Sequence, residues 1–456
     1  MRFRWVWTIG ALGVAAAKHC HPKHVHLSAV DENSAVVSFS VSIQCHPGSK
    51  LLSTVWFRDD HGEIQSANLP FREPQQYNAT LKQGDLYQSH RIYHILLPNL
   101  RPNTLYDYKC GVSQADDKRV SLREKTPPTW HRTEWFSFQS LPAAGDRIKL
   151  AVIADLGQSS RALLTREALL SSDYSTILLA GDISYANNKH TKWDKWFESM
   201  QDMLSRSPLM VTAGNHKVEV DYRTQTVFDA YEARFAMPRI QDAIRGPSSR
   251  SMNGSSSISK MDYPLRYEYG NSFYAVTLGN ARLLVLNSLV SLRPDSVQYR
   301  WLERELGGVD RTVTPWVLVM THCPMYNSFL RHRDEQPAEE LYTYVEPLLV
   351  RYRVNLVLGG HVHAYQRTHA VAQRRRTPTG PYHLVVGDGG EGNGNKESFA
   401  PDVDWVAYRD RALTSGYAIL DLINATHAHW DWTAHASPQH PNASDRVFLV
   451  NQYFLA

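Results

Sequence analysis

Short segments in which apolar and polar residues alternate fill the chain from residue 24 to about residue 140. A period of two is the mark of half-buried strands, and turn residues separate these segments. The segments are "HVHLSAV", "SAVVSFSVS", "STVWFRD", "YHILLPNL", "LYDYKCGV" and "TEWFSFQS". We therefore expect residues 24–142 to form a β-sandwich.

The pattern changes at about residue 147, where fully apolar runs begin to alternate with amphipathic segments. The amphipathic segments include "SSRALLTREALLSS", "WDKWFESMQDMLSRS" and "DSVQYRWLERELGG". Apolar runs of strand length between helical segments are typical of an α/β domain. Residues 147–456 are therefore predicted to form a second, α/β domain.

The N-terminal 17 residues have the three parts of a cleavable secretory signal: Arg2 and Arg4, an apolar stretch, and the small residues 15–17. No later stretch approaches the length of a membrane span. We expect a secreted protein, with the extracellular space, a vacuole and a lysosome left open as destinations. N-glycosylation is expected at Asn-x-Ser/Thr sites, which are Asn78, Asn253, Asn424 and Asn442.

Charge and cysteine content argue against some classes of partner and of fold. The formal net charge of +4 falls by two when Arg2 and Arg4 leave with the signal, which argues against nucleic acid as a partner. With four cysteines, the chain is not a fold stabilised mainly by disulfides. One disulfide is expected among Cys20, Cys45 and Cys110, with its pairing open, while Cys323 is expected to be a buried free thiol.

Five apolar runs of the second domain end in polar clusters: "LAVIADLGQ", "TILLAGDISY", "LMVTAGNHK", "WVLVMTHCPMYNS" and "NLVLGGHVHAY". In open α/β sheets the ligand site lies beyond the carboxyl ends of the strands, so these clusters are expected to meet. Each cluster alone is a weak signal. Together they supply seven metal-competent side chains, which are Asp155, Asp182, Tyr185, Asn215, His322, His361 and His363.

These side chains fall into two chemically different sets. Asp155, Asp182 and the phenolate of Tyr185 offer hard anionic oxygens suited to a trivalent ion, and only a strongly polarising cation such as Fe(III) would keep a tyrosine ionised at acidic pH. Asn215 with two imidazoles suits a divalent ion such as Zn, Fe or Mn. The resulting positive centre favours an anionic substrate, and two metals about 3.5–4 Å apart can clamp a phosphate group. Phosphoester hydrolysis is the predicted reaction.

The five clusters resemble, in order, the five motifs of the purple acid phosphatases, a family of the metallophosphoesterase superfamily. They appear here as "DLG", "GDISY", "GNH", "VMTH" and "GHVH". The resemblance implies a calcineurin-like catalytic domain with two mixed β-sheets flanked by helices. Residues 97–108 also look like the strand corner of fibronectin type III domains, so the long, plant-like form of the family is implied, with a fibronectin-III-like β-sandwich before the catalytic domain.

Carried over by position, the resemblance implies three roles for the seven side chains. Asp155, Tyr185 and His363 would hold Fe(III), while Asn215, His322 and His361 would hold the divalent ion. Asp182 would bridge the two ions.

Gly157 and Tyr185 separate this family from most other metallophosphoesterases, which carry a histidine at the first position and no tyrosine ligand.

The resemblance also implies roles for residues around the metals. His216 and His332 match positions that bind phosphate or protonate the leaving group, and Asn215 and Arg331 are expected to help bind the substrate. Arg331 stands where the long form often has a histidine, and Lys217 where it usually has an acidic residue. We expect both cations to favour polyanionic phosphates. Glu335 and Gln366 receive no role beyond the rim of the site.

The expected activity is that of a secreted acid phosphatase, which hydrolyses small phosphate monoesters by metal-activated water or hydroxide without a phosphoenzyme intermediate. A phosphodiesterase or nucleotide pyrophosphatase of the same superfamily is the alternative, and the sequence does not decide between them. A third hypothesis is a non-enzymatic protein whose metal domain has decayed into a binding module. Because all seven metal positions are filled, the sequence disfavours this third hypothesis.

Overall fold

The structure is a computed structural model, and it describes residues 19–114, 129–238, 263–391, 398–435 and 443–455. The expected signal (1–17) and two of the expected glycosylation sites, Asn253 and Asn442, lie outside these residues. The other two acceptors, Asn78 and Asn424, are exposed to solvent. Among the helices of the described residues, none combines the length and the apolar composition that a membrane span requires.

The N-terminal part consists of strands in two main sheets. One sheet has the order β1-β2-β8-β5, and the other has the order β10-β9-β3-β4 with β11 also paired to β9. The strands are β1 (Lys23–Asp31), β2 (Ser34–Val41), β3 (Leu51–Arg58), β4 (Gln65–Ala67), β5 (Pro70–Gln75), β6 (Asn78–Thr80), β7 (Leu86–Gln88), β8 (Arg91–Leu97), β9 (Leu105–Gln114), β10 (His131–Arg132) and β11 (Phe136–Gln139). Side chains from both sheets form one apolar core.

A disulfide joins Cys20 to Cys45 beside this core. The expectation of one disulfide among Cys20, Cys45 and Cys110 is thereby confirmed, and its pairing is defined. Cys110 is a buried free thiol, and Cys323 is one as expected.

The second part contains two larger mixed sheets, as expected for an α/β fold. Their orders are β14-β13-β12-β24-β25-β26 and β15-β16-β17-β18-β22-β19-β23. The strands are β12 (Ile148–Ile153), β13 (Thr176–Leu179), β14 (Leu209–Val211), β15 (Tyr274–Leu278), β16 (Ala281–Val285), β17 (Trp316–Met320), β18 (Leu356–Gly359), β19 (Tyr365–Thr368), β20 (Val371–Ala372), β21 (Arg375–Arg376), β22 (Tyr382–Val386), β23 (Val406–Arg409), β24 (Gly416–Leu422), β25 (His427–Ala434) and β26 (Ser444–Val450). The segments β12 to β14 and β16 to β18 are parallel within their sheets.

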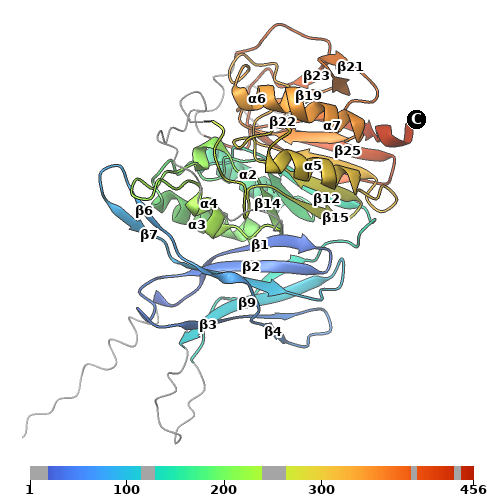
Figure 1. The fold of residues 1–456 in the computed structure, drawn as a ribbon. Helices are drawn as coiled ribbons and strands as arrows, with labels where there is room; N and C mark the ends of the chain where they lie inside the picture. Colours follow the sequence, from blue (N-terminus) through green and yellow to red (C-terminus); the bar gives the residue numbers. More distant parts are fainter. Residues whose placement is uncertain (1–18, 115–128, 239–262, 392–397, 436–442, 456) are drawn as a thin grey trace, which may run out of the picture.

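Helices flank the two sheets (Figure 1). They are α2 (Ser160–Leu170), α3 (Thr191–Leu204), α4 (Asp229–Arg234), α5 (Val297–Gly307), α6 (Gln336–Glu340) and α7 (Glu346–Arg351), with shorter helical turns at Asn215–Lys217, Leu341–Val345 and Gln452–Leu455. The three helices expected from the sequence are α2, α3 and α5. Helix α2 begins where the Ser159 hydroxyl accepts hydrogen bonds from Arg161 N and Ala162 N, because a serine at this position satisfies otherwise unpaired donors.

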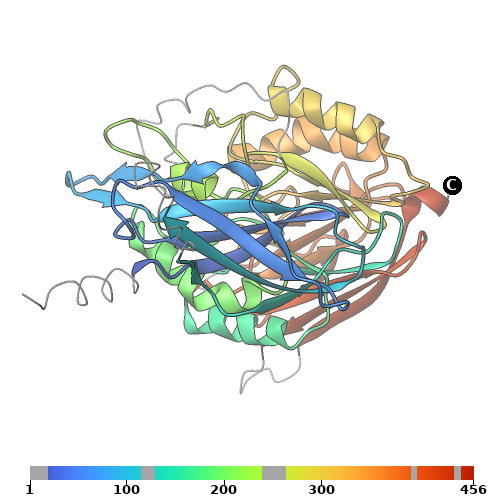
Figure 2. The same cartoon turned by 90° about the horizontal axis from the view of Figure 1, so that it is seen from below.

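The N-terminal part packs beneath the second part, on the side of α3 and α4, and the two views agree on this arrangement (Figures 1 and 2). Strand β1 contacts α3: Lys23 Nζ lies 3.1 Å from Glu198 Oε1, and the backbone N of Val25 donates to Gln201 Oε1 at 2.9 Å. Tyr77 and Ala79 extend the apolar core of the second part into the N-terminal sheets. The two parts therefore share a buried interface.

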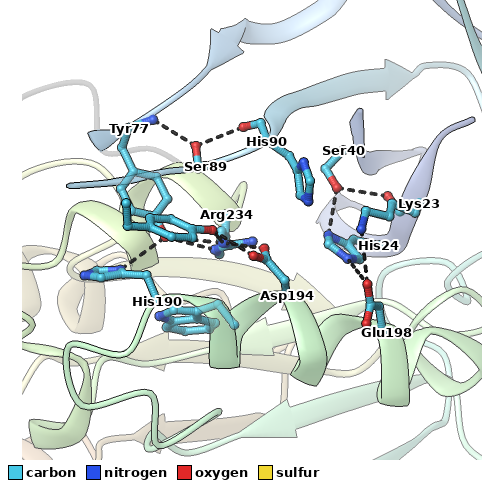
Figure 3. Close-up of polar contacts among 12 residues, drawn as sticks. Lys23, His24, Ser40, Tyr77, Ser89, His90, His190, Asp194, Glu198 and Arg234 are labelled. Atoms are coloured by element: carbon cyan, nitrogen blue, oxygen red, sulfur yellow. Dashed lines mark hydrogen bonds and ion pairs between the residues drawn. The ribbon is translucent and has the colours of Figure 1, made fainter. Parts of the chain in front are cut away.

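Arg234 is the charged centre of this interface (Figure 3). Its guanidinium, only 2% exposed, donates to Asp194 Oδ1 at 2.9 Å and to Tyr87 Oη at 2.9 Å. Tyr77 Oη lies 3.3 Å from the same guanidinium and 3.3 Å from His190 Nδ1. Because Arg234 and Asp194 belong to helices of the second part while both tyrosines belong to the first, this cluster ties the two parts together.

Candidate metal centre

The structure brings the seven sequence-predicted side chains together at the carboxyl ends of five strands. Asp155 follows β12, and the stretch after β13 carries Asp182 and Tyr185. Asn215 follows β14 in the same sheet, whereas His322 follows β17 and the pair His361 and His363 follows β18 in the other sheet. Two sheets that end at a common edge thus assemble a centre from residues more than 200 positions apart.

One half of the centre is an oxygen-rich group. Tyr185 Oη donates to Asp155 Oδ1 at 2.7 Å and lies 2.9 Å from His363 Nε2. His363 Nε2 lies 3.6 Å from the same Asp155 oxygen. These three side chains present a carboxylate, a phenol and an imidazole to one point, as the predicted Fe(III) set requires.

The other half contains the remaining amide and imidazoles. His322 Nε2 lies 2.9 Å from Asn215 Oδ1 and 3.4 Å from Asp182 Oδ2. The other nitrogen of His322, Nδ1, lies 2.9 Å from the carbonyl oxygen of Ala180. A backbone acceptor on Nδ1 fixes the tautomer and leaves Nε2 directed at the centre, as in many metal-bound histidines.

Asp182 lies between the two halves. Its Oδ1 accepts a hydrogen bond from His216 N at 2.9 Å, while its buried Oδ2 has no hydrogen-bond partner among the described residues. Ligand atoms of Asp155, Asp182 and His322 lie within 4.8 Å of one another. An orphaned, buried carboxylate oxygen at the junction of two donor groups fits a bridging ligand.

His361 connects the centre to a residue that the sequence analysis missed. Its backbone N donates to Asp155 Oδ2 at 2.7 Å, and its ring Nε2 lies 2.7 Å from Glu335 Oε2. Glu335 Oε1 lies 2.8 Å from His332 Nδ1, so one carboxylate orients both imidazoles. Only the spacing of His332 and Glu335 (i, i+3) pointed to this contact in the sequence, and the assignment of Glu335 to the rim alone was incomplete.

The backbone at the centre adopts an uncommon conformation. Asp155, Asp182, Tyr185 and His361 all have positive φ angles, at 52°, 45°, 48° and 69°. Such angles are costly for residues other than glycine and persist where the surrounding structure enforces them, which is common at functional sites. The strands and their close contacts therefore hold the donor atoms in place.

The position of Gly157 in the first motif disfavours a larger side chain. A Cβ atom there would lie 2.6 Å from Glu391 Oε2 and 3.4 Å from Tyr185 Cδ2, and Gly157 has a φ of +64°. Glu391 and the tyrosine ring thus fill the space that a larger side chain would need.

The electrostatic environment of the centre favours bound cations. Burial raises the pKa of Asp182, but His322 and His216 outweigh it and hold that pKa well below its usual range. Burial alone would lower the pKa of His322, yet Asp182 and Asp155 raise it to about 9. Burial and both aspartates raise the pKa of Tyr185 well above its usual value. Only a strongly polarising cation at the phenol oxygen would ionise this side chain, so the donor set fits a trivalent ion.

A cavity of about 430 Å³ opens beside the metal-competent residues. His216, Arg331 and His363 line it together with Lys192 and Glu391.

Some residues that were predicted to contact the substrate line the cavity, and others lie beside it. His216 Nδ1 lies 2.7 Å from Asn187 Oδ1, and its Nε2 lies 3.9 Å from Asp182 Oδ2. The ring of His332 lies against that of His361, with ring centroids 3.9 Å apart and the two planes tilted by 48°. Lys217, by contrast, is fully buried and is not among the cavity-lining residues. Arg331 is therefore placed to meet a substrate and Lys217 is not.

Gln366 also lies away from the rim. Its side chain is buried, and its Oε1 accepts a hydrogen bond from Ser328 N at 2.9 Å. The sequence-based placement of Gln366 at the rim was therefore wrong. The residue fixes the loop that leads to Arg331 and His332.

Comparison with known proteins identifies the family. The calcineurin-like phosphoesterase model matches residues 148–365, and the model of the C-terminal part of iron/zinc purple acid phosphatase-like proteins matches residues 380–440. Purple acid phosphatase 18 of Arabidopsis thaliana is 31% identical over 423 residues, which are 90% of this chain and 85% of the relative. The Fe(3+)-Zn(2+) purple acid phosphatase 12 of the same plant is 26% identical over 457 residues, 95% of this chain and 86% of the relative.

A solved structure shows the same fold. Purple acid phosphatase PPD1 from yellow lupin (Lupinus luteus) seeds superimposes with a TM-score of 0.75 at 17% sequence identity, covering 94% of this chain and 74% of the lupin chain. The five-strand arrangement, the tyrosine in the donor set and the sequence similarity along nearly the whole chain agree: the protein belongs to the purple acid phosphatase family.

Proposed function

We propose that this chain is a dinuclear-metal acid phosphatase that hydrolyses small phosphate monoesters. The observation that carries the proposal is the buried contact of Tyr185 Oη with Asp155 Oδ1 at 2.7 Å and with His363 Nε2 at 2.9 Å. A phenol in such a position is the donor that distinguishes an Fe(III) site from the sites of other metallophosphoesterases. A relative named for Fe(3+) and Zn(2+) supports the same metal pair.

In this proposal the donor groups divide as the sequence implied. Asp155, Tyr185 and His363 would hold Fe(III), and Asp182, whose buried Oδ2 has no hydrogen-bond partner among the described residues, would serve both ions. The divalent ion, Zn in the first instance, would be held by Asn215, His322 and His361. Glu335 contacts the Nε2 of His361 at 2.7 Å and orients that ring. When bound, the two ions supply Lewis acidity, which polarises the phosphate and lowers the pKa of water.

The chain's own residues orient the substrate and move the proton. His216 presents its Nε2 toward the bridging carboxylate, so this nitrogen is positioned to donate to a phosphate oxygen, with the Asn215 amide beside it. Arg331 contributes positive charge at the cavity wall. His332 uses Nδ1 for Glu335, which leaves Nε2 to protonate the departing oxygen. Water attacks the phosphorus directly, and no phosphoenzyme forms.

The visible absorption spectrum tests the metal assignment. The oxidised wild-type protein is expected to show a phenolate-to-Fe(III) charge-transfer band, and Tyr185→Phe prepared identically is expected to lack it. A colourless wild type with both metals present would overturn the assignment. Relative rates on p-nitrophenyl phosphate and bis(p-nitrophenyl) phosphate test the substrate class, because a phosphodiesterase would favour the second compound.

The same proposal includes export. Residues 1–17 act as a cleaved signal, and Asn78 and Asn424 are exposed acceptors for glycans. Expression in a eukaryotic host should place the glycosylated protein in the medium, whereas a chain without residues 1–17 should stay inside the cell. Retention of the full chain inside the cell, in an acidic vacuole or lysosome, would point to that destination instead.

A further inference from the structure

Lys217 is one of the two residues at which the resemblance implies a departure from the long form, and the structure places it in an unusual environment. Its side chain has no exposed surface, and its Nζ has no hydrogen-bond partner among the described residues. A buried ammonium is costly unless neighbouring groups compensate for its lost hydration. The compensation must therefore come from what surrounds the Nζ atom.

Two aromatic rings surround it. Lys217 Nζ lies 5.3 Å from the centroid of the Tyr185 ring and 5.0 Å from the ring of Trp193. Ring faces attract cations, and the attraction is larger when both groups are shielded from water. Trp193 is itself held by a hydrogen bond of 2.9 Å from its Nε1 to Glu219 Oε2. The Lys217 ammonium therefore lies in a pocket between the rings of Trp193 and Tyr185.

The pocket lies against the residue that the proposed function assigns to Fe(III). Tyr185 directs its oxygen at Asp155 and His363, while Lys217 approaches its ring. Lys217 is absent from the cavity lining and has no exposed surface, so it does not reach a substrate. Its charge therefore acts on the centre from behind, on the ring of Tyr185 and, over a longer range, on the carboxylate of Asp182.

We propose that Lys217 tunes the metal centre by holding a positive charge over the ring of Tyr185. The inference rests on the proposed function, because it requires Tyr185 to be the Fe(III) ligand. A cation over the ring stabilises electron density on the phenolate relative to the metal. It therefore raises the energy of the phenolate-to-Fe(III) charge transfer, and it favours the reduced state of the iron.

The test compares three variants with the wild type at one pH, after metal analysis has established equal loading. Lys217→Met keeps the length of the side chain without its charge, and its charge-transfer band is expected at longer wavelength. Its Fe(III)/Fe(II) midpoint potential is expected to be lower. Lys217→Arg keeps the charge and is expected to keep a band closer to that of the wild type. Lys217→Gln is a second neutral variant and is expected to shift the band in the same direction as Lys217→Met.

Lys192→Met is the matched control. Lys192 lines the cavity and donates to the backbone oxygen of Tyr185 at 3.1 Å, but no contact of its ammonium with the ring is present. Its removal takes the same charge from the same region, and the band is expected to stay in place.

The outcomes separate the two proposals. A band at the wild-type position in both neutral variants, or an equal shift in Lys192→Met, overturns the role of Lys217 while leaving the Tyr185 assignment intact. A purely structural lysine would lower the unfolding midpoint without moving the band. Absence of a band in the wild type would overturn the metal assignment itself.

Discussion

The interface arginine offers the sharpest test of how the two parts of the chain are held together. Arg234→Met removes the guanidinium labelled in Figure 3 and leaves Asp194 without this charged partner. The side chains of Arg234 and Asp194 are 2% and 17% exposed. Removing one partner of a buried ion pair costs about 3–5 kcal/mol, mainly because the other charge stays buried. Since Asp194 keeps the hydrogen bond from Tyr87 Oη at 2.9 Å, we expect a loss at the lower end, about 3 kcal/mol.

Equilibrium unfolding in urea measures this loss. A double variant, Arg234→Met with Asp194→Leu, should recover at least half of it, because removing both charges removes the desolvation penalty as well. Arg446→Met is the control: it breaks an ion pair of 3.1 Å whose side chains are 62% and 30% exposed. Such surface pairs contribute about 1 kcal/mol or less. If Arg234→Met and Arg446→Met have similar effects, the argument that the buried cluster couples the two parts is refuted.

Three further predictions concern the metal centre and acid stability. Glu335→Gln keeps the size of the side chain that orients His332 and His361. The variant should lower kcat by about 10–100-fold and shift the pH profile of kcat. Unchanged kinetics would exclude this orienting role. Burial lowers the pKa of His24 and of His190 to about 4, so the folded state prefers both rings neutral. The neutral rings make their full contribution to the free energy of unfolding above about pH 6.5. This contribution is lost as the pH falls toward 4, by up to about 3 kcal/mol for each histidine. Urea titrations should show a steeper fall in the free energy of unfolding over this pH range for the wild type than for His190→Phe. Removal of both metals under reducing conditions with a chelator should lower the unfolding temperature and abolish turnover, and readdition of iron and zinc should restore both.

The positions of the metal-competent residues could be predicted from the sequence because each follows a strongly apolar strand. Asp155 after β12 and His322 after β17 are typical: the apolar run identifies the strand, and the topology of α/β sheets places its end at the site. The helices α3 and α5 were likewise evident from their apolar period, whereas the period is weaker in α2, which exposes Leu164 and buries Thr165. In both cases local patterns and general rules of sheet geometry are sufficient.

Contacts between loops could not be predicted in this way. Glu335 reaches His361 across 26 positions that include α6, α7 and β18, and no periodic pattern links the two. Arg234 meets Tyr77 across 157 positions, on opposite sides of the boundary between the two parts. Lys217 was expected to add positive charge for a substrate, but the short helical turn Asn215–Lys217 rotates its side chain into the interior. Side-chain direction in such turns depends on tertiary packing, which the sequence pattern does not encode.

The geometry of the centre links metal binding to the stability of the fold. Asp155, Asp182 and Tyr185 hold buried donors on backbone with positive φ angles, and one oxygen of Asp182 lacks a hydrogen-bond partner among the described residues. In the chain without metals, each of these features lowers the free energy of unfolding. A cation that binds the folded centre and not the unfolded chain offsets that cost, and stabilises the fold by RT ln(1 + c/Kd), where c is the free metal concentration. The metals therefore serve two purposes in this chain, since the strained strand ends that prepare the site for chemistry also make the second part of the fold dependent on its ions.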